Sequence, residues 1–365
     1  MPNSLYAITK SDLFDLFSRV ARTSRVFVPY KYNDKFYFDK FNPAKEDTIE
    51  LGGIRQNEPL KSFINPAREK IIGESTQDPR AVIVAGVKAC DLSSFILQDF
   101  VFMKGGYIDP FYAFHRNNTL IISSDCTFAK ETCFCLAMDG RPYPAVYFDI
   151  NLSSLGNKFL VEVGSDRGRS IINSYKTFFK DVKNGDLNKR DEARENVCDQ
   201  VRGFIKKIGT PGTSEIKGTV KKHYDNLMMW QDHSSTCVEC GACNLVCPTC
   251  HCFQLFDAST SLSINPEHGR RVDEKPQEKR VRGRVWDSCL YETFAKVAGG
   301  ANPRRHLYER LRNRFDKKFA FFPEILNYFA CTGCGRCIDA CPGDIDLREV
   351  LKGLVRGSWK KPPHD

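Results

Sequence analysis

The sequence predicts an α+β protein in which an N-terminal α/β domain with a small mixed sheet precedes a cysteine-rich C-terminal domain. Two observations support this prediction. Short apolar runs alternate with helical patterns in the first part of the chain, as is typical of a sheet covered by helices. Further along, the spacing Cys-x2-Cys-x2-Cys-x3-Cys-Pro occurs twice, and residues 248–330 separate the two copies.

Residues 1–165 are expected to form the α/β domain. Its first helix begins in the segment SDLFDLFSRVA, with Ser11 as the N-cap, and a β-hairpin follows around Asn33-Asp34. A later helix is expected to start near Asp91. The apolar runs that predict the remaining strands are residues 81–87, 119–124, 145–150 and 158–164.

The rest of the chain divides into three segments. Residues 166–235 are rich in charge and predict a helical linker region that ends in one helix over residues 218–234. Residues 236–345 hold both cysteine runs, and the insertion 248–330 between them is expected to be helical. Residues 346–365 are expected to form a basic tail that frays after one or two helical turns.

The composition limits where the protein works and what its cysteines do. The chain has 365 residues, of which 16 are cysteine, and a formal net charge of +9. We find no run of about 18 apolar residues and no secretory signal, so we expect a cytoplasmic protein without membrane insertion. Because the cytosol is reducing, cysteines at this density are expected to bind metal rather than to form disulfides.

Both cysteine runs have the spacing of bacterial two-cluster ferredoxins. Two residues between successive cysteines allow the loop to curl around one face of a [4Fe–4S] cluster, and the proline after the fourth cysteine redirects the chain. The cysteines are Cys237, Cys240, Cys243 and Cys247 in the first run, and Cys331, Cys334, Cys337 and Cys341 in the second. Structural zinc is the alternative, but zinc sites use separated Cys-x2-Cys pairs or histidine, which this spacing does not match.

In two-cluster ferredoxins the fourth cysteine of each run ligates the other run's cluster. The first cluster is therefore expected on Cys237, Cys240, Cys243 and Cys341. The second cluster is expected on Cys331, Cys334, Cys337 and Cys247. The C-terminal domain is thus predicted to be a bacterial-type two-[4Fe–4S] ferredoxin domain with a long helical insertion.

Another set of cysteines lies in the N-terminal domain. Cys90 and Cys126 each follow a predicted buried strand, and neighbouring strands bring their ends to one edge of a sheet. Cys133 and Cys135 lie in the loop after the second of these strands. Four thiols at one sheet edge predict a third [4Fe–4S] cluster, and the alternatives are ordinary buried cysteines or a zinc site.

The remaining cysteines allow more than one interpretation. Cys250 and Cys252 follow the first run directly, and Cys289 lies far downstream. With His251 they form either a further metal site or modified cluster, or a set of sulfurs that pack beside the clusters without binding iron. Cys198, in a charged helix, has no expected role.

A basic helix is expected to begin at Asn302. Its basic residues include Arg310, Arg312, Arg314, Lys317 and Lys318. They form a solvated face, a docking surface for an acidic partner, or a set of charges that balances the clusters. Each cluster with its four thiolates adds about −2, so three clusters lower the formal charge of +9 to about +3. No nucleic-acid motif and no dinucleotide fingerprint occurs, so nucleic-acid binding is not expected.

Several motifs occur in an order that resembles a known family. They are GVKACDL, Cys133-Phe134-Cys135, CGACNLVCPTCHCF, RVWDSC, AGGANPR and CTGCGRCIDACPGDID. Together they resemble the iron–sulfur subunits that include the beta subunit of sulfhydrogenases and the A subunit of anaerobic sulfite reductase. Related subunits accompany heterodisulfide-reductase-like and flavin oxidoreductase complexes. The resemblance covers nearly the whole chain.

The resemblance implies an electron-transfer subunit of an oxidoreductase complex of anaerobic metabolism, which is not catalytic alone. Such a subunit relays electrons between a flavin subunit that oxidises NAD(P)H, or a comparable donor, and a catalytic reductase or hydrogenase. It implies the same ligands as the spacing and supports the N-terminal cysteines as a further site. Two alternatives remain: a sulfite- or disulfide-type reductase with a substrate-binding cluster near Cys250, Cys252 and Cys289, or a non-redox interaction protein with structural clusters.

Overall fold

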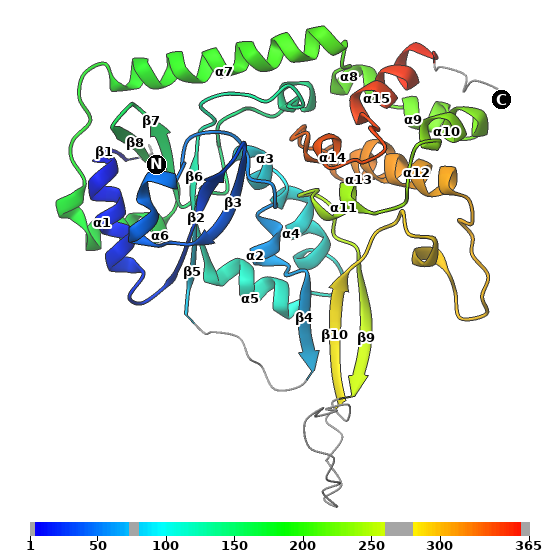
Figure 1. Cartoon of the computed structure of the whole chain (residues 1–365), viewed down its shortest axis with the longest axis horizontal. Coiled ribbons are helices and arrows are strands. Elements are labelled where there is room, and N and C mark those ends of the chain that lie inside the picture. Colours follow the sequence, from blue (N-terminus) through cyan, green and yellow to red (C-terminus); the bar gives the residue numbers. More distant parts are fainter. Residues whose placement is uncertain (1–3, 73–79, 260–279, 359–365) are drawn as a thin grey trace, which may run out of the picture.

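The N-terminal part of the chain is built on a seven-stranded sheet (Figure 1). The computed structural model describes residues 4–72, 80–259 and 280–358. In spatial order the strands are β1 (Leu5–Thr9), β8 (Lys158–Val163), β7 (Ile150–Ser154), β6 (Thr119–Ser124), β5 (Val82–Val87), β2 (Arg25–Tyr32) and β3 (Lys35–Lys40). The pairs β7–β6, β6–β5 and β5–β2 are parallel, whereas β1–β8, β8–β7 and β2–β3 are antiparallel. The predicted mixed sheet and the hairpin around Asn33 are therefore confirmed.

Helices cover both faces of this sheet, because successive residues of a strand point to opposite sides. In β5, Ile83 and Ala85 face one core, and Val82 and Val84 face the other. α1 and α6 pack on the first face, and α2, α4 and α5 pack on the second. The helices of this part are α1 (Lys10–Val20), η1 (Pro43–Thr48), α2 (Lys61–Ile64), α3 (Ala89–Leu92), α4 (Phe95–Met103), α5 (Pro110–Asn118), η2 (Cys135–Met138), α6 (Asp166–Ser174) and η3 (Lys176–Phe178).

The C-terminal part is mainly helical and has a core of its own. Trp230, Phe315 and Leu351 are fully buried in this core, which also receives Phe134 from the N-terminal part. The helices are α7 (Asp186–Ile208), α8 (Thr213–Ile216), α9 (Thr219–Lys222), α10 (Leu227–Ser234), α11 (Ala242–Leu245), η4 (Glu292–Ala295), α12 (Leu307–Asp316), η5 (Lys317–Phe321), α13 (Phe322–Leu326), α14 (Arg336–Asp339) and α15 (Leu347–Arg356). A mixed α/β architecture with a C-terminal cysteine domain is thus confirmed.

A three-stranded sheet projects from the body of the molecule (Figure 1). Its strands, in spatial order, are β4 (Arg68–Ile72), β10 (Arg280–Trp286) and β9 (Phe253–Ser259), and both pairs are antiparallel. The buried guanidinium of Arg284 joins this sheet to the body, because it pairs with Glu69 at 2.7 Å and also with Asp109 of the loop before α5.

The insertion 248–330 therefore contains a β-hairpin as well as helices, where helices alone were expected. β10 gains its second partner from β4, which lies about two hundred residues earlier, and local sequence periodicity carries no information on such a distant pairing. Residues 260–279 of the expected helical insertion lie outside the described residues.

Two helix boundaries differ from the expectation. Thr9, rather than Ser11, caps α1, because its hydroxyl oxygen accepts a hydrogen bond from the Asp12 N–H at 3.0 Å. The single helix expected over residues 218–234 is divided into α9 and α10, and the Asn226 side chain caps the second of them.

One strand boundary also differs. β7 covers Ile150–Ser154, whereas the apolar run predicted a strand over residues 145–150. The Asp149 carboxylate accepts the Ile121 N–H at 2.8 Å, so this side chain takes a donor that a longer ladder would have used. The strand therefore starts at Ile150, five residues after the expected start.

The basic C-terminal segment is part of the folded core, at least to residue 358. α15 buries one apolar face, which consists of Leu347, Val350, Leu351 and Leu354. Its three helical turns are held by this packing, whereas we expected a tail that frays. Residues 359–365 of the expected tail lie outside the described residues.

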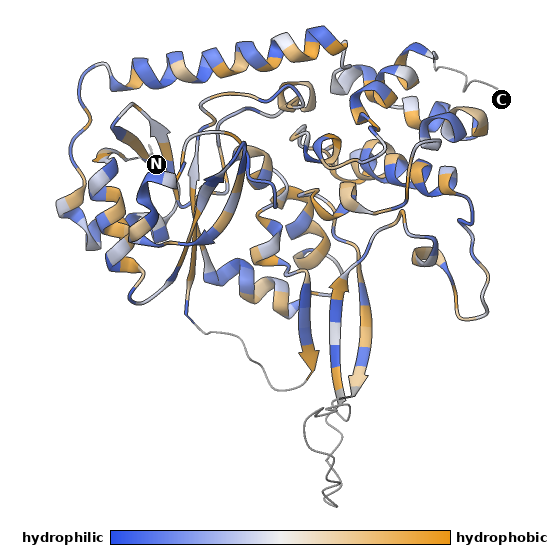
Figure 2. Cartoon of the chain, viewed as in Figure 1, coloured by the Kyte–Doolittle hydropathy of each residue, from blue (hydrophilic) through white to orange (hydrophobic). Residues whose placement is uncertain are grey.

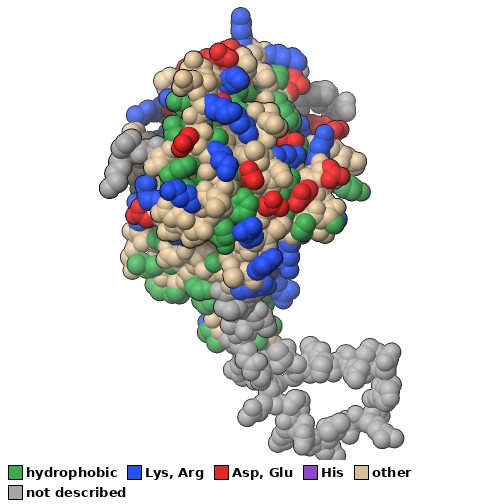
Figure 3. Space-filling model, turned by 90° about the vertical axis from the view of Figure 1, so that its left-hand side faces the viewer, with side chains coloured by type: hydrophobic (Ala, Val, Ile, Leu, Met, Phe, Trp, Pro, Cys, Tyr) green, Lys and Arg blue, Asp and Glu red, His purple; other side chains and the backbone are tan. Residues whose placement is uncertain are grey.

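The long helix α7 runs over the α/β part toward the C-terminal helices (Figure 1). It is mostly hydrophilic (Figure 2), and its buried face includes Val197, Cys198 and Val201. On the face of the molecule drawn in Figure 3, lysine and arginine side chains are interspersed with aspartate and glutamate. Of the helices in the described part of the chain, none is long and apolar enough to cross a membrane.

The contact between the two parts of the chain depends on glycine at residue 335. Gly335 has a φ of +73°, and a Cβ at this position would lie 2.2 Å from the Thr132 carbonyl oxygen. Gly218 has a similar φ of +80°, but nothing lies within 4 Å of a Cβ there. An alanine would therefore strain the backbone at both positions, but only at Gly335 would its Cβ collide with a neighbouring residue.

We predict that Gly335→Ala lowers the stability of the chain far more than Gly218→Ala. The left-handed backbone costs about 1–2 kcal/mol at either position, and the collision with Thr132 adds about 1–3 kcal/mol at Gly335 alone. Thermal unfolding of the iron-loaded chain measures both variants. Equal losses of Tm would contradict the close contact between the two parts.

Candidate metal centres

The two cysteine runs fold in the same way. In each, a glycine with a positive φ stands two residues before the third cysteine: Gly241 at +70° and Gly335 at +73°. A short helix then follows, α11 in the first run and α14 in the second. Glycine adopts this backbone without the cost that a Cβ brings, so the chain turns tightly and presents its thiols to one side.

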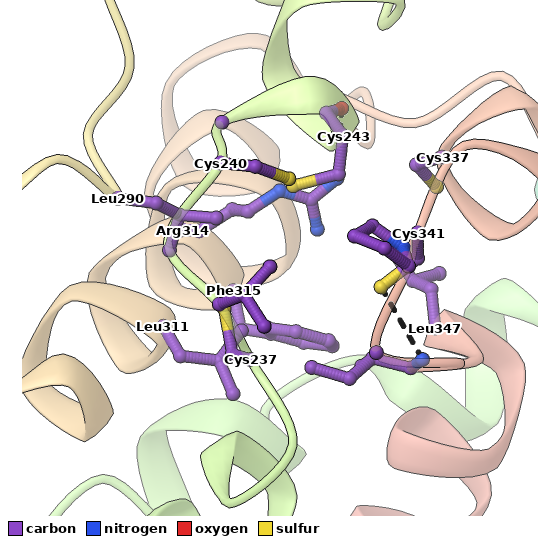
Figure 4. A pocket seen from close by; sticks show the side chains of 15 residues that line it. Cys237, Cys240, Cys243, Leu290, Leu311, Arg314, Phe315, Cys337, Cys341 and Leu347 are labelled. Carbon is purple, nitrogen blue, oxygen red and sulfur yellow. Dashed lines mark hydrogen bonds between the residues drawn. The ribbon is translucent and has the colours of Figure 1, made fainter.

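The first cavity is lined by cysteines from both runs (Figure 4). Cys237, Cys240 and Cys243 come from the first run, and Cys341 comes from the second. The sulfur of Cys341 also accepts the Ile345 N–H at 3.4 Å. Apolar side chains, among them Leu290, Leu311 and Phe315, close the cavity around these thiols.

A second group of cysteines also combines the two runs. Cys331 and Cys337 each have Cys247 and Cys334 among their electrostatic neighbours. Cys247 and Cys334 are buried. The fourth cysteine of the first run is therefore close to the other three cysteines of this group.

A third group lies at the edge of the large sheet. Because β5 and β6 are parallel neighbours, the segments that follow them bring Cys90 and Cys126 together. Cys133 and Cys135 line the same cavity, and Cys334 of the second run borders it. The Phe134 N–H donates to the Gly333 carbonyl at 2.9 Å, which fixes the loop with Cys133 and Cys135 against the second run.

The spacing of these thiols suits a cluster better than a single ion. In residues 4–72, 80–259 and 280–358, no three Cys, His, Asp or Glu side chains converge closely enough to hold one metal ion. A zinc ion binds four ligands at about 2.0–2.3 Å and therefore needs such convergence. Thiols that stand apart around a cavity fit a larger iron–sulfur group.

Buried cations surround the cysteine groups. Their side chains are almost fully removed from solvent and lie close enough to cysteines for charge to act between them. These residues are Arg55, Lys61, Lys88, Arg314, Lys318 and Arg336. Arg55 pairs with Asp339 and Arg336 pairs with Asp91, each at 2.6 Å.

The other buried cations have no such carboxylate partner within the described residues: Lys61, Lys88, Arg314 and Lys318. Lys88 donates to the Leu51 and Asp125 carbonyls and to the Ser124 hydroxyl. The negative charges of Asp125 and Glu50 also act on Lys88, although neither carboxylate forms a close ion pair with it. A buried ion without close opposite charge costs several kcal/mol, and thiolates beside these cations would supply such charge.

The surroundings of Cys247 favour its thiolate form. A hydrogen bond from the Cys250 thiol, together with the positive charges of Lys318 and Arg314, holds the pKa of Cys247 well below its usual value despite burial. Burial raises the pKa of Cys126 and of Cys331 to about 12. Those two thiols keep their protons at neutral pH unless a bound metal replaces them.

The further cysteines lie near the first run: Cys250 is close to Cys247, and Cys289 is close to Cys243. Cys289 is buried, and its sulfur accepts the Asn244 side-chain N–H at 3.2 Å. Burial raises the pKa of Cys252, which has Cys289 as a neighbour, to about 11. His251 packs edge-on against Phe322, and burial lowers its pKa to about 4.

The sequence interpretation missed most of the buried cations. It treated the basic residues after Asn302 first as a solvated face, yet Arg310, Arg314 and Lys318 are all buried. Their spacing of four residues places them on one face of a helix, and this is the signal that could have identified them. Lys61 and Lys88 carry no comparable local signal.

Comparison with known proteins supports an iron–sulfur domain in the C-terminal part of the chain. Residues 236–345 match the family model of a 4Fe-4S dicluster domain. The chain is 29% identical to Sulfhydrogenase 2 subunit beta of Pyrococcus furiosus over 361 residues, which is 96% of this chain and 99% of that protein. The resemblance inferred from the motifs is confirmed, and the chain carries an iron–sulfur domain of the electron-transfer type.

The N-terminal cysteines allow a direct test. If they hold a cluster, replacing Cys133 and Cys135 by serine lowers the iron content by about four atoms per chain, from about twelve to about eight. Iron and acid-labile sulfide are measured on anaerobically purified protein. Cys198→Ser, which changes a buried cysteine of α7, serves as the matched control and leaves the iron content unchanged. Unaltered iron in the double variant would remove this site from the account.

Proposed function

We propose that this chain is a relay subunit with three [4Fe–4S] clusters. Cys237, Cys240, Cys243 and Cys341 hold the first cluster. Cys331, Cys334, Cys337 and Cys247 hold the second. Cys90, Cys126, Cys133 and Cys135 hold the third. Such clusters accept and release single electrons.

The observation that carries the proposal is the set of buried cations without carboxylate partners. Lys88 stands beside Cys90 and Cys126, and Lys318 stands beside Cys247 and Cys331. In a chain without clusters these charges would destabilise the fold, whereas next to thiolate-bound iron they are compensated.

The three sites form a line. Cys337 borders the cavity of the first site, and Cys334 borders the cavity of the third. Both are proposed ligands of the second site, which therefore lies between the other two. The exposed Cys240 marks one end of the line, and the half-exposed Phe128 lies over the other. Electrons can thus enter at one end and leave at the other.

The partners follow from the relative. Its name makes it one subunit of a sulfhydrogenase. We propose that this chain likewise works in a hetero-oligomer in the cytoplasm. One partner is a flavin subunit that oxidises NAD(P)H or a similar donor, and the other is a catalytic reductase or hydrogenase.

The other cysteines are assigned supporting roles. Cys250 packs beside Cys247 and its thiol donates to the Asn244 side-chain oxygen, whereas Cys289 packs beside Cys243 and Cys252 beside Cys289. None of the three binds iron. The alternative hypothesis, in which they shape a substrate-binding cluster, requires that a substrate can reach them from solvent. Cys289 is buried, however, and Cys250 faces Cys247. The relay is therefore favoured over a catalytic subunit.

We predict that Cys240→Ser blocks electron flow through the assembled complex. It weakens the first cluster at the exposed end of the line, so turnover with the natural donor falls at least about tenfold, while the oligomer stays intact. Activity and size-exclusion profiles of the reconstituted complex measure this. Cys198→Ser is the control. Unchanged flow in Cys240→Ser would favour clusters that only brace the fold.

The isolated chain separates the relay from the catalytic alternative. The relay accepts electrons from dithionite but reduces neither sulfite nor a disulfide when it is purified without partners. Turnover of either substrate by the isolated chain with an artificial donor would overturn the relay.

A further inference from the structure

Lys318 occupies an unusual place in the backbone. It lies in η5, a π-helical turn between α12 and α13, and its side chain is only 5% exposed. Single π-helical turns alter the direction of side chains within a helix and are frequent at functional sites. Here the turn accompanies a lysine that points inward, while the preceding Lys317 is exposed.

The Lys318 ammonium makes direct contact with a proposed cluster ligand. It lies 3.3 Å from the Cys247 sulfur and donates to the Thr249 hydroxyl at 2.8 Å and to the Ala330 carbonyl at 2.9 Å. No carboxylate within the described residues shares its charge. Its field therefore acts on the Cys247 side of the second site.

The surroundings of the second site differ from those of the other two. Arg55 and Arg336 approach Cys334, but each is paired with a carboxylate. Arg314 is shared, since it approaches both Cys243 of the first site and Cys337 of the second. Lys61 also has Cys247 nearby, but its ammonium donates to the Asn244 and Cys250 carbonyls. Among the described residues, Lys318 is thus the cation without a carboxylate partner whose ammonium contacts a ligand sulfur of the proposed second site.

Burial makes electron uptake unfavourable, because the reduced form carries one more negative charge in a medium of low dielectric constant. The proposed second site lies between the other two and includes the buried Cys247 and Cys334, so this effect lowers its potential. A fixed positive charge beside a ligand sulfur acts in the opposite direction and raises the potential.

We propose that the positive charge of Lys318 raises the reduction potential of the middle site. Electrons can then pass through this site between the first and the third. The inference rests on the proposed three-site relay. The step concerned is the uptake of one electron, supplied by dithionite in the experiment and by a reduced flavin in the complex; no bond forms or breaks.

The test is a redox titration of the iron-loaded chain, followed by electron paramagnetic resonance. In Lys318→Met, one reduction wave moves to a more negative potential and the other waves stay in place. Lys318→Arg, which keeps the charge, restores that wave toward its original potential. Lys317→Met removes the same charge one residue away, at an exposed position, and leaves every wave unchanged.

Three results would overturn the inference: unchanged waves in Lys318→Met with full iron content, a common shift of all waves, or the same shift in Lys317→Met. If Lys318→Met loses iron, Lys318→Gln replaces it in the titration, because glutamine keeps a hydrogen-bond donor without the charge. A negative shift of one wave in Lys318→Gln supports the inference, and unchanged waves overturn it. Failure of the proposed relay is distinguishable, since it would appear as unchanged electron flow through the complex in Cys240→Ser, whatever the waves of the Lys318 variants do.

Discussion

The structure depends on positive charge buried next to sulfur. Lys61, Lys88, Arg314 and Lys318 are removed from water without a carboxylate partner in the described part of the chain. A protein interior tolerates such charges only where negative charge is close. In the proposed relay the cysteines provide it once iron has displaced their protons, and the fold and the clusters then stabilise one another.

This constraint explains how the two parts of the chain are joined. Arg55, from the N-terminal part, pairs with Asp339 in the second cysteine run, and Arg336 of that run pairs with Asp91 beside Cys90. The same arginines that link the parts also face the sulfurs of two sites. The ferredoxin-like segment is therefore not an independent module, because its second run is built into the edge of the large sheet.

Much of this arrangement could be predicted from the sequence. The spacing of the cysteine runs, the parallel strands that end near Cys90 and Cys126, and the early hairpin all depend on local pattern. Local pattern decides turns and strands, and the cysteine spacing predicts which thiols share a cluster, an assignment that stays a prediction.

What could not be predicted depends on distant contacts. β4 pairs with β10 across much of the chain, and Lys61 reaches the Cys250 carbonyl from the N-terminal part. A lysine in a sequence gives no sign that it will be buried, because its side chain is usually solvated. Most of the buried cations were therefore identified only from the structure. The spacing of Arg310, Arg314 and Lys318 is the exception, because it could have predicted that these three side chains share one face of a helix.

The central claim is that the buried cations balance three iron–sulfur clusters. Native mass spectrometry of the chain, purified without oxygen, tests this most directly. The account predicts the mass of the polypeptide plus three units of about four iron and four sulfide each. A chain that carries zinc, or that remains folded with no inorganic mass at all, would contradict it.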